Sequence, residues 1–289
     1  MPDGIIHPGQ HDGDLIRYLD AFRPPLQMCN ESLRSVGEDI IPPLLGALQA
    51  IGLSLFVTHS LKYLARVCGK SGGEMHLAKI NDPHFHPNAG RADTCVMLLA
   101  RDAELVGCIG SRLIWCEETL ADEMESGRFW VADPATMWSS KDRCITNSET
   151  ARSISSCPVV YSGSVYLDPS VRGGIALAAL CRLHLLWLAF HWRWAWLVGV
   201  VHGGLLHNHV FDIYGVEFVE QAIWLTRDDD NELHRYQLAF NRKRTSVKAW
   251  LRPEMADLSR PMGLPPRSIL RTEAPKEIRG SKRPSTQKR

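Results

Sequence analysis

The stretch SVYLDPSVRGGIALAALCRLH, from Ser164 to His184, decides the fold of this chain. It places an extended apolar run, a proline, an arginine and two adjacent glycines directly before a long apolar helix. Adjacent glycines at such a position either leave backbone N–H groups open to an anion or form a tight strand-to-helix corner. The two interpretations lead to different proteins, and the glycines alone do not separate them.

The anion interpretation follows from the physics of a helix start. The first N–H groups of a helix have no acceptor within the helix, and together they carry about half a positive charge. In a helix that begins near Gly173, the glycines at 173 and 174 would keep side chains away, and Arg172 would add a donor. A pyrophosphate would be held well there. In the alternative, the glycines only tighten a corner against the sheet.

A β-hairpin is the clearest local pattern elsewhere in the chain. Two apolar runs, Cys95–Ala100 and Leu105–Trp115, flank the polar turn Arg101–Glu104. Such a pattern is typical of two antiparallel strands. Further expected elements are a strand at 158–167 with a bulge at Ser162-Gly163, a helix at about 173–192, a strand at 195–201, a short helix at about 204–213, and strands in 216–226 and 233–244. This order predicts an α/β fold: a mixed, mostly antiparallel sheet with helices on its faces.

Three segments flank or interrupt this core. Residues 1–52 are expected to form a helical extension, with a short helix around 14–22 and a second helix broken at Pro42–Pro43. A strand at 53–59 and a helix capped by Ser60 then open the main domain, 53–257. Residues 117–157, acidic and then Ser/Thr-rich, form an insertion with a helical start. The basic tail, 258–289, is expected to be disordered.

Composition excludes several classes of function. The 33 Lys and Arg nearly cancel the 32 Asp and Glu, so no overall field favours a nucleic-acid partner. Eight cysteines without CxxC pairing, and an N-terminus without an apolar leader, indicate reduced thiols in the cytoplasm. The histidine pairs at 84–86 and 207–209 lack partner ligands nearby, so we expect no metal site. The sequence says nothing about oligomeric state.

One stretch imitates a membrane span. Residues 175–206 are mostly apolar, but Arg182, Arg193 and three histidines interrupt them. Because an arginine near a bilayer centre costs about 2.5–3.5 kcal/mol, we expect a buried helix and a buried strand and no membrane partner.

The order of elements resembles the GNAT superfamily of acyl-CoA-dependent N-acetyltransferases. The stretch VYLDPSVRGGIALAAL, 165–180, matches the strand, the Asp-Pro pair and the Arg-Gly start of that family's signature loop. LVG at 105–107 is similar to its second hairpin strand, and YGVEF at 214–218 to the segment before its last hairpin. The resemblance covers roughly residues 53–245 and implies a GNAT-like fold.

The resemblance implies an acetyl-CoA site and an amine that attacks the thioester directly. Backbone groups of Val165, Tyr166 and Leu167 would pair with the pantetheine amides. Amides of the loop would hold the pyrophosphate, and a backbone N–H at the splayed end of the 158–167 strand would stabilise the oxyanion. The loop residues in question are Arg172, Gly173, Gly174, Ile175 and Ala176.

Two departures from the family pattern leave the catalytic groups open. The Gly loop is one residue short, and Phe211 stands where many members carry a proton-donating Tyr. Tyr214 and His202 are the substitute candidates for proton transfer, and Glu117 and Glu118 for deprotonating the amine. Each has a plainer interpretation as a packed or solvated side chain. The two functional hypotheses are therefore an N-acetyltransferase and an inactive, CoA-binding regulatory or interaction domain.

Overall fold

The computed structural model describes residues 16–17, 31–70, 77–172, 174–202, 213, 215–226, 232–259 and 269–271. Over these residues the strands form one ten-stranded sheet in the order β1-β2-β3-β4-β6-β7-β9-β8-β10, and β5 pairs with β8 beside it. The strands are β1 Ile16–Arg17, β2 Ser54–Thr58, β3 Thr94–Arg101, β4 Glu104–Thr119, β5 Cys144–Thr146, β6 Ser155–Leu167, β7 Trp196–His202, β8 Phe218–Thr226, β9 Leu233–Arg242 and β10 Ile269–Arg271.

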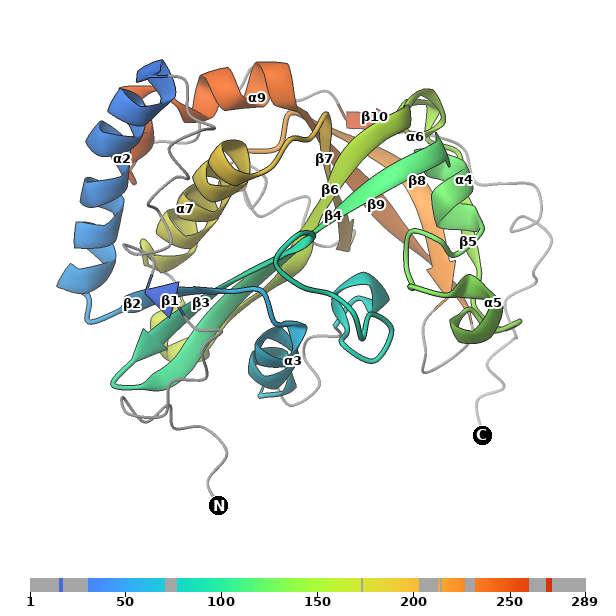
Figure 1. The fold of residues 1–289 in the computed structure, drawn as a ribbon, viewed down its shortest axis with the longest axis horizontal. Coiled ribbons are helices and arrows are strands. Elements are labelled where there is room, and N and C mark those ends of the chain that lie inside the picture. Colours follow the sequence, from blue (N-terminus) through green and yellow to red (C-terminus); the bar gives the residue numbers. More distant parts are fainter. Residues whose placement is uncertain are drawn as a thin grey trace, which may run out of the picture.

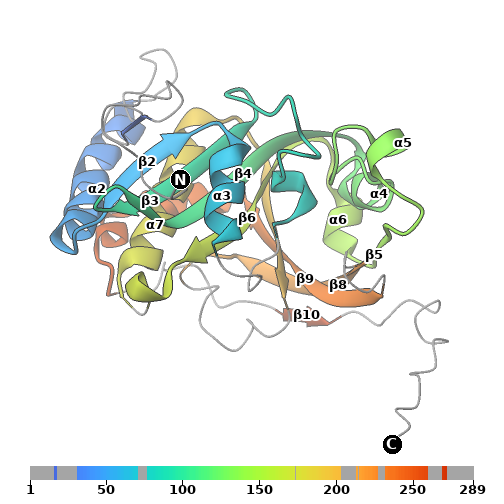
Figure 2. The same cartoon turned by 90° about the horizontal axis from the view of Figure 1, so that it is seen from below.

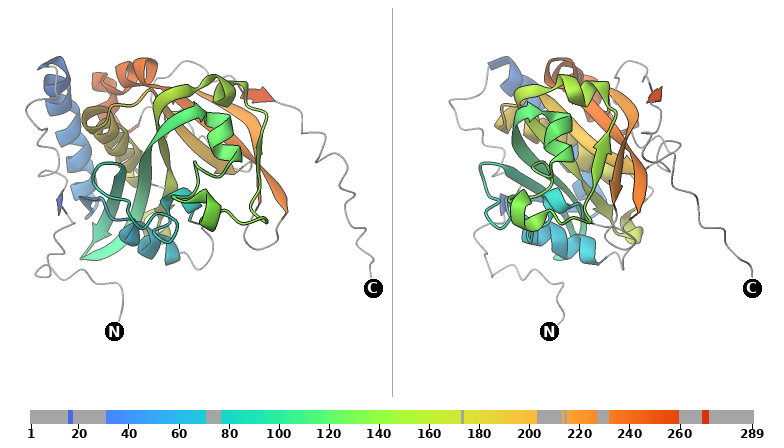
Figure 3. Two further views of the ribbon diagram at one scale, coloured as in Figure 1. Left: turned by 45° about the vertical axis from the view of Figure 1, so that its right-hand side comes forward. Right: turned by 90° about the vertical axis from the view of Figure 1, so that its right-hand side faces the viewer.

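Helices cover both faces of this sheet (Figure 1). One face packs against α2, α7 and α9, and the other against α3, η1 and the α4–α6 segment; Figures 2 and 3 show the second face from other directions. The helices are α2 Glu31–Ala50, α3 Leu61–Gly69, η1 Lys79–Asn81, α4 Leu120–Glu125, α5 Pro134–Met137, α6 Glu149–Ser153, η2 Pro169–Val171, α7 Ala176–His191, α9 Lys243–Trp250 and η4 Pro253–Ala256. The expected mixed α/β sheet with helices on its faces is confirmed.

The predicted hairpin is formed by β3 and β4. Arg101 pairs with Glu104, and the two residues between them, Asp102 and Ala103, have φ angles of 49° and 67°. Positive φ at both central positions is the geometry of a type I′ turn, whose twist matches that of the flanking strands. β4 then runs to Thr119, further than expected, because it stays paired with β6 as far as Ser155.

The apolar stretch after residue 175 is a buried helix followed by a strand, as predicted. α7 is buried on nearly all sides between the sheet and α2, and Trp192 and Trp194 after it are also buried. Of the helices that the structure describes, none is both long and apolar enough to cross a membrane.

Several expectations at the two ends of the chain differ from the structure. Ile16–Arg17 pairs with β2 as a strand, where a helix was expected. α2 continues through Pro42 and Pro43, although each proline removes one backbone hydrogen bond. Burial of the apolar face of α2 in the core contributes more stability than these two lost hydrogen bonds cost. Within the tail expected to be disordered, β10 pairs with β8 in parallel. Apart from Leu258 and Ser259, the rest of that tail lies outside the described residues, and so does the expected short helix at 204–213 except Ile213.

The insertion at 117–157 is more regular than expected. It contains α4, α5 and α6, and its strand β5 pairs with the far end of β8, from Cys144 opposite Leu225 to Thr146 opposite Ile223. Its apolar side chains share a core with the sheet, so the segment is an integral wall of the second face.

Candidate functional site

The strands β6 and β7 run in parallel but pair only from Val159 to Tyr161, opposite Trp196 to Val198. Beyond that point β6 stays paired with β4 as far as Leu167, while β7 stays paired with β9 as far as His202. Each strand therefore keeps its outer neighbour while the two inner edges separate. This opening is the point in the sheet where an extended ligand could lie between strands.

A cavity of about 170 Å³ occupies the opening. Its walls come from the separating halves of β6 and β7, its floor from α7, and its sides from β4 and β9. The lining residues are Ile109, Ser162, Gly163, Ser164, Val165, Cys181, His184, Leu185, Leu197, Gly199, Val200, Val201, His202, Val216, Ala239 and Asn241. Since most of these are apolar, the cavity fits a largely apolar group with a few polar contacts.

A β-bulge shapes the wall formed by β6. The register slips between Gly163, which pairs with Gly110, and Tyr166, which pairs with Cys108, so that two residues of β6 oppose one of β4. Ser164 in this bulge has a φ of 54°. The sequence placed the bulge at Ser162-Gly163, two residues too early. A bulge bends its strand and re-aims its backbone, which turns this part of β6 away from β7.

Asn81 of η1 holds the bulge from the second face of the sheet. Its Nδ2 donates to Ser164 Oγ at 3.1 Å, and the Asn81 side chain is buried. The two paired glycines beneath leave room for it: a Cβ on Gly110 would lie 3.2 Å from Asn81 Nδ2. Asn81 was not singled out from the sequence, because the contact spans 83 residues.

Gly199 keeps the opposite wall clear. A Cβ at this position would lie 3.2 Å from the carbonyl oxygen of Ser162 on β6 and 3.9 Å from Ala239 Cβ. Any side chain here would therefore point into the space between the separating strands. Because residue 199 has no side chain, the space between β6 and β7 stays open close to the last residues at which the two strands pair.

The first turn of α7 follows the short segment, including η2, that connects it to the end of β6. Ile175 occupies the N-cap position, and within the described residues no side chain caps the helix start. Gly174 is exposed, and nothing lies within 4 Å of where its Cβ would be. The first amides of the helix thus have no side-chain cap, which suits an anion. Gly173 lies outside the described residues.

Arg172 is placed next to this helix start, but its side chain turns back toward the strand. Its Nε donates to the carbonyl oxygen of Leu167 at 2.8 Å, and the guanidinium lies 5.8 Å from the Tyr166 ring centroid. The side chain is exposed at the surface. Ala176, in contrast, is fully buried, so only its backbone could contact a ligand.

The three residues expected to pair with pantetheine lie in the separated half of β6. Val165 is partly buried and lines the cavity, whereas Tyr166 and Leu167 are buried and pair with β4 at Cys108 and Gly107. Their side chains pack on the sheet, so the inner backbone edge is what they present to the opening.

His202 is the proton-transfer candidate that the structure brings to the cavity. It ends β7, is exposed, and lies with its ring centroid 5.8 Å from that of Tyr236. Tyr214 and Phe211 lie outside the described residues.

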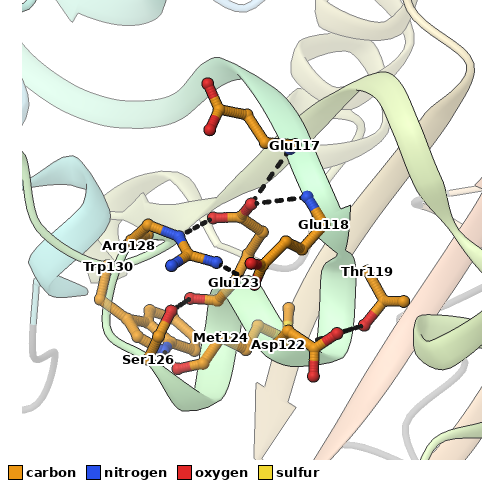
Figure 4. A network of polar contacts seen from close by, with 9 residues as sticks. All are labelled: Glu117, Glu118, Thr119, Asp122, Glu123, Met124, Ser126, Arg128 and Trp130. Atoms are coloured by element: carbon orange, nitrogen blue, oxygen red, sulfur yellow. Dashed lines mark hydrogen bonds and ion pairs between the residues drawn. The ribbon is translucent and has the colours of Figure 1, made fainter.

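Glu117 and Glu118 are not brought to the cavity. They lie on β4, eight and nine residues from Ile109, which is about 25 Å along an extended strand. Figure 4 shows their environment: both backbone N–H groups donate to Oε1 of Glu123, at 3.0 and 3.2 Å. The Glu118 carboxylate pairs with Arg128, whose Nε also donates to Glu123 at 2.8 Å. Buried Glu123 thus closes the register slip at this end of β4.

Two buried polar residues in the cavity wall were not singled out from the sequence. His184 on α7 is fully buried, and its Nε2 shares a hydrogen bond of 3.0 Å with Ser111 Oγ. Burial lowers the pKa of His184 to about 3, so the ring is neutral. Asn241 on β9 accepts the N–H of Glu217 at 2.6 Å. A histidine inside an otherwise apolar helix was the one signal that could have revealed the first of them.

The paired histidines at 84 and 86 have no ligand geometry. His86 Nε2 lies 2.9 Å from the carbonyl oxygen of Trp130, and burial together with Arg112 lowers its pKa to about 4. Over the described residues, no three His, Cys, Asp or Glu side chains gather where they could hold a metal ion.

Comparison with known proteins finds only remote structural similarity. No protein-family profile and no curated protein matches the chain. Among solved structures, Arabidopsis thaliana NAA60 in complex with a bisubstrate analogue is 11% identical, over 65% of this chain and 97% of that one, with a TM-score of 0.40. A GNAT-family acetyltransferase from Streptococcus pneumoniae is 8% identical, over 65% and 98%, with a TM-score of 0.34.

A probable N-acyltransferase from Enterococcus faecalis V583 is 13% identical, with a TM-score of 0.34. That match covers 57% of this chain and 32% of the Enterococcus protein, about a third of its length. Identities and TM-scores this low carry nothing about the activity of this chain, which has to be argued from its own geometry.

Proposed function

We propose that the protein is an acyl-CoA-dependent N-acyltransferase, with acetyl-CoA as the donor that the sequence resemblance implies and an amine as the acceptor. The observation that carries the proposal is the cavity between the separated halves of β6 and β7, which α7 lines through Cys181, His184 and Leu185. The apolar slot would take a long neutral arm, and the backbone amides at the start of the same helix would take an anionic diphosphate.

The roles of the residues follow from their positions. The inner backbone edge of Val165–Leu167 would pair with the pantetheine amides as an added half-strand. The amides of Gly174, Ile175 and Ala176, with the backbone of Arg172 and Gly173, would hold the diphosphate. A backbone N–H at the Ser164 bulge would donate to the carbonyl oxygen as it gains negative charge.

The reaction is a direct transfer. The amine nitrogen attacks the thioester carbonyl carbon, a C–N bond forms, the C–S bond breaks, and the CoA thiolate leaves. The amine loses one proton and the thiolate gains one, so a single exchangeable group at the cavity mouth can serve both needs. His202 is the described residue in that position, and Tyr214 remains a further candidate.

One observation favours the second candidate function, a CoA-binding domain without catalysis. The two carboxylates Glu117 and Glu118 lie on β4 about 25 Å along the strand from Ile109 of the cavity, and His184 in the cavity wall is buried and neutral. A domain with the donor site but without a group to deprotonate the amine would bind CoA as a regulator.

Thermal unfolding with acetyl-CoA, followed by a turnover assay, separates these possibilities. Acetyl-CoA at 100 times its Kd should stabilise the fold by about 2.7 kcal/mol. Release of CoA thiol in the presence of a panel of amines, with His202→Ala as the comparison, then supports the transferase. Stabilisation without turnover on any amine supports the regulator, and no stabilisation refutes both.

A further inference from the structure

A second cavity, called the β4 recess below, lies beside β4 at the point where β3 begins. Its volume is about 280 Å³, and it shares no lining residue with the cavity between β6 and β7. Asn88 and Ala132 in its lining are exposed, and Asp93 and Ile114 are half-buried, so the recess is open to solvent. Sites for drug-sized ligands usually exceed about 300 Å³, so the β4 recess fits a smaller molecule.

His86 in the wall of the β4 recess has a fixed ring and a known tautomer. The residue is 7% exposed, and its Nε2 lies 2.9 Å from the carbonyl oxygen of Trp130. Because a carbonyl oxygen only accepts hydrogen bonds, Nε2 carries the ring hydrogen. Burial, with Arg112 nearby, lowers the pKa of His86 to about 4, so the ring is neutral and Nδ1 holds a lone pair.

Nδ1 of His86 is both unpaired and reachable. It makes no hydrogen bond with any described residue, yet it keeps accessible surface, whereas Nδ1 of His184 is unpaired and closed off. Since His86 is otherwise buried, the accessible surface of Nδ1 opens into the recess that the residue lines. A hydrogen-bond donor on a ligand in the β4 recess can therefore contact it.

Donor groups line the same recess. Two nitrogens of the Arg128 guanidinium pair with Glu123 and Glu118, and Figure 4 shows the third, Nη1, without a partner among the residues drawn. The Arg128 side chain is 41% exposed, and the Asn88 amide is exposed as well. A carbonyl oxygen on a ligand can accept a hydrogen bond from either side chain.

The charges around the β4 recess already have partners. Arg112 Nη2 lies 2.6 Å from a carboxylate oxygen of Asp93, and Arg128 pairs with two carboxylates. An anionic ligand would find no unpaired cation there, and its oxygens would face the lone pair of His86. A cationic ligand would lie near Arg112, which already disfavours positive charge at His86. A neutral ligand avoids both penalties.

We propose that the β4 recess is a binding site for a small neutral molecule that carries a carboxamide on an apolar body. The amide N–H donates to Nδ1 of His86, the amide oxygen accepts from Arg128 or Asn88, and the apolar body packs against Ile114 and Ala132. A carboxamide suits this lining because it has a donor and an acceptor side by side. The inference goes beyond the proposed function and does not depend on it.

NMR titration of the purified protein with four probes that share one ring tests this assignment: benzamide, acetophenone, benzoate and benzylamine. Acetophenone has the shape of benzamide but a methyl group in place of the NH₂. We expect benzamide to bind about fivefold more tightly than acetophenone, which corresponds to one hydrogen bond, and more tightly than either charged probe. Benzamide should also shift the ¹⁵Nδ1 signal of one histidine, and that signal should be missing in His86→Gln.

Two variants and a matched control locate the binding. His86→Gln keeps an amide that can donate to the Trp130 carbonyl but removes Nδ1, so benzamide should bind no more tightly than acetophenone. Ala132→Phe, at an exposed position of the lining, should fill the recess and weaken benzamide binding at least tenfold. Ala135→Phe makes the same change at an exposed residue outside the lining and should leave the affinity unchanged.

Each other outcome overturns a stated part of the inference. Equal binding of benzamide and acetophenone by the unchanged protein overturns the contact with His86, whether or not the glutamine variant folds. Tightest binding of benzoate or benzylamine overturns the neutral ligand. If none of the four probes binds, or if Ala132→Phe binds benzamide as well as Ala135→Phe does, the β4 recess is not the site. None of these results bears on the binding of CoA between β6 and β7.

Discussion

Replacing Gly199 with valine should close the donor site without removing any contact. The new Cβ would lie 3.2 Å from the carbonyl oxygen of Ser162, and the two methyl groups would enter the space between β6 and β7. Gly199 has no left-handed φ, and valine is favoured in strands, so the backbone itself accepts the change. Overpacking of this kind costs about 1–3 kcal/mol of folding stability.

The effect on the ligand should be larger than the effect on the fold. For a chain of this size, the 2.7 kcal/mol expected from acetyl-CoA at 100 times its Kd corresponds to a rise in Tm of about 5–11 °C. Gly199→Val should lose nearly all of this rise, and Gly199→Ala, which adds only the Cβ, should lose part of it. Differential scanning fluorimetry with and without acetyl-CoA measures both. An unchanged ligand-induced rise in the valine variant would refute the placement of the donor between these strands.

Three further predictions concern stability. Glu123→Ala should lower the free energy of unfolding by about 2–3 kcal/mol, because two backbone N–H groups and Arg128 lose their acceptor. Glu123→Gln should lower it by less than half of that, because the amide oxygen still accepts from the backbone. Urea titration of both variants measures the two free energies. Gly46→Ala, at an exposed position of α2 with nothing near its Cβ, should raise stability by about 0.5–1 kcal/mol in the same assay, and a loss would show that α2 is strained there. The pKa of His184 is about 3 in the folded protein and 6.5 ordinarily, so below pH 6.5 the unfolded chain binds a proton that the folded chain does not bind. The free energy of unfolding should therefore fall as the pH drops below 6.5, by about 2 kcal/mol at pH 5. His184→Gln should remove that part of the pH dependence.

Local patterns in the sequence predicted the elements whose signals are local. The β3–β4 hairpin, the strand at β6 and the apolar helix α7 each follow from a run of side chains and a turn within about twenty residues. The path of α2 through Pro42 and Pro43 could not be predicted in this way. Its cause is the packing of the α2 apolar face on α7, which is a contact between distant segments.

The site could be predicted in outline but not in its contents. Of the residues predicted from the sequence, Val165 and His202 line the cavity, whereas Arg172, Gly174, Ile175 and Ala176 are not among the lining residues. The lining also includes Asn241, which lies more than seventy residues after the end of β6 in the chain. Glu117 was expected at the site because the family resemblance implies a carboxylate after this strand, but β4 continues past Glu117 to Thr119.

Hydrogen exchange with and without CoA tests the central claim most directly, because it reports where on the chain the ligand is held. Peptides that cover residues 164–178 contain the inner edge of β6 and the first turn of α7. With saturating CoA, the account predicts at least tenfold slower exchange in these peptides and little change in those that contain Glu117. Binding of CoA that leaves residues 164–178 unprotected would contradict it.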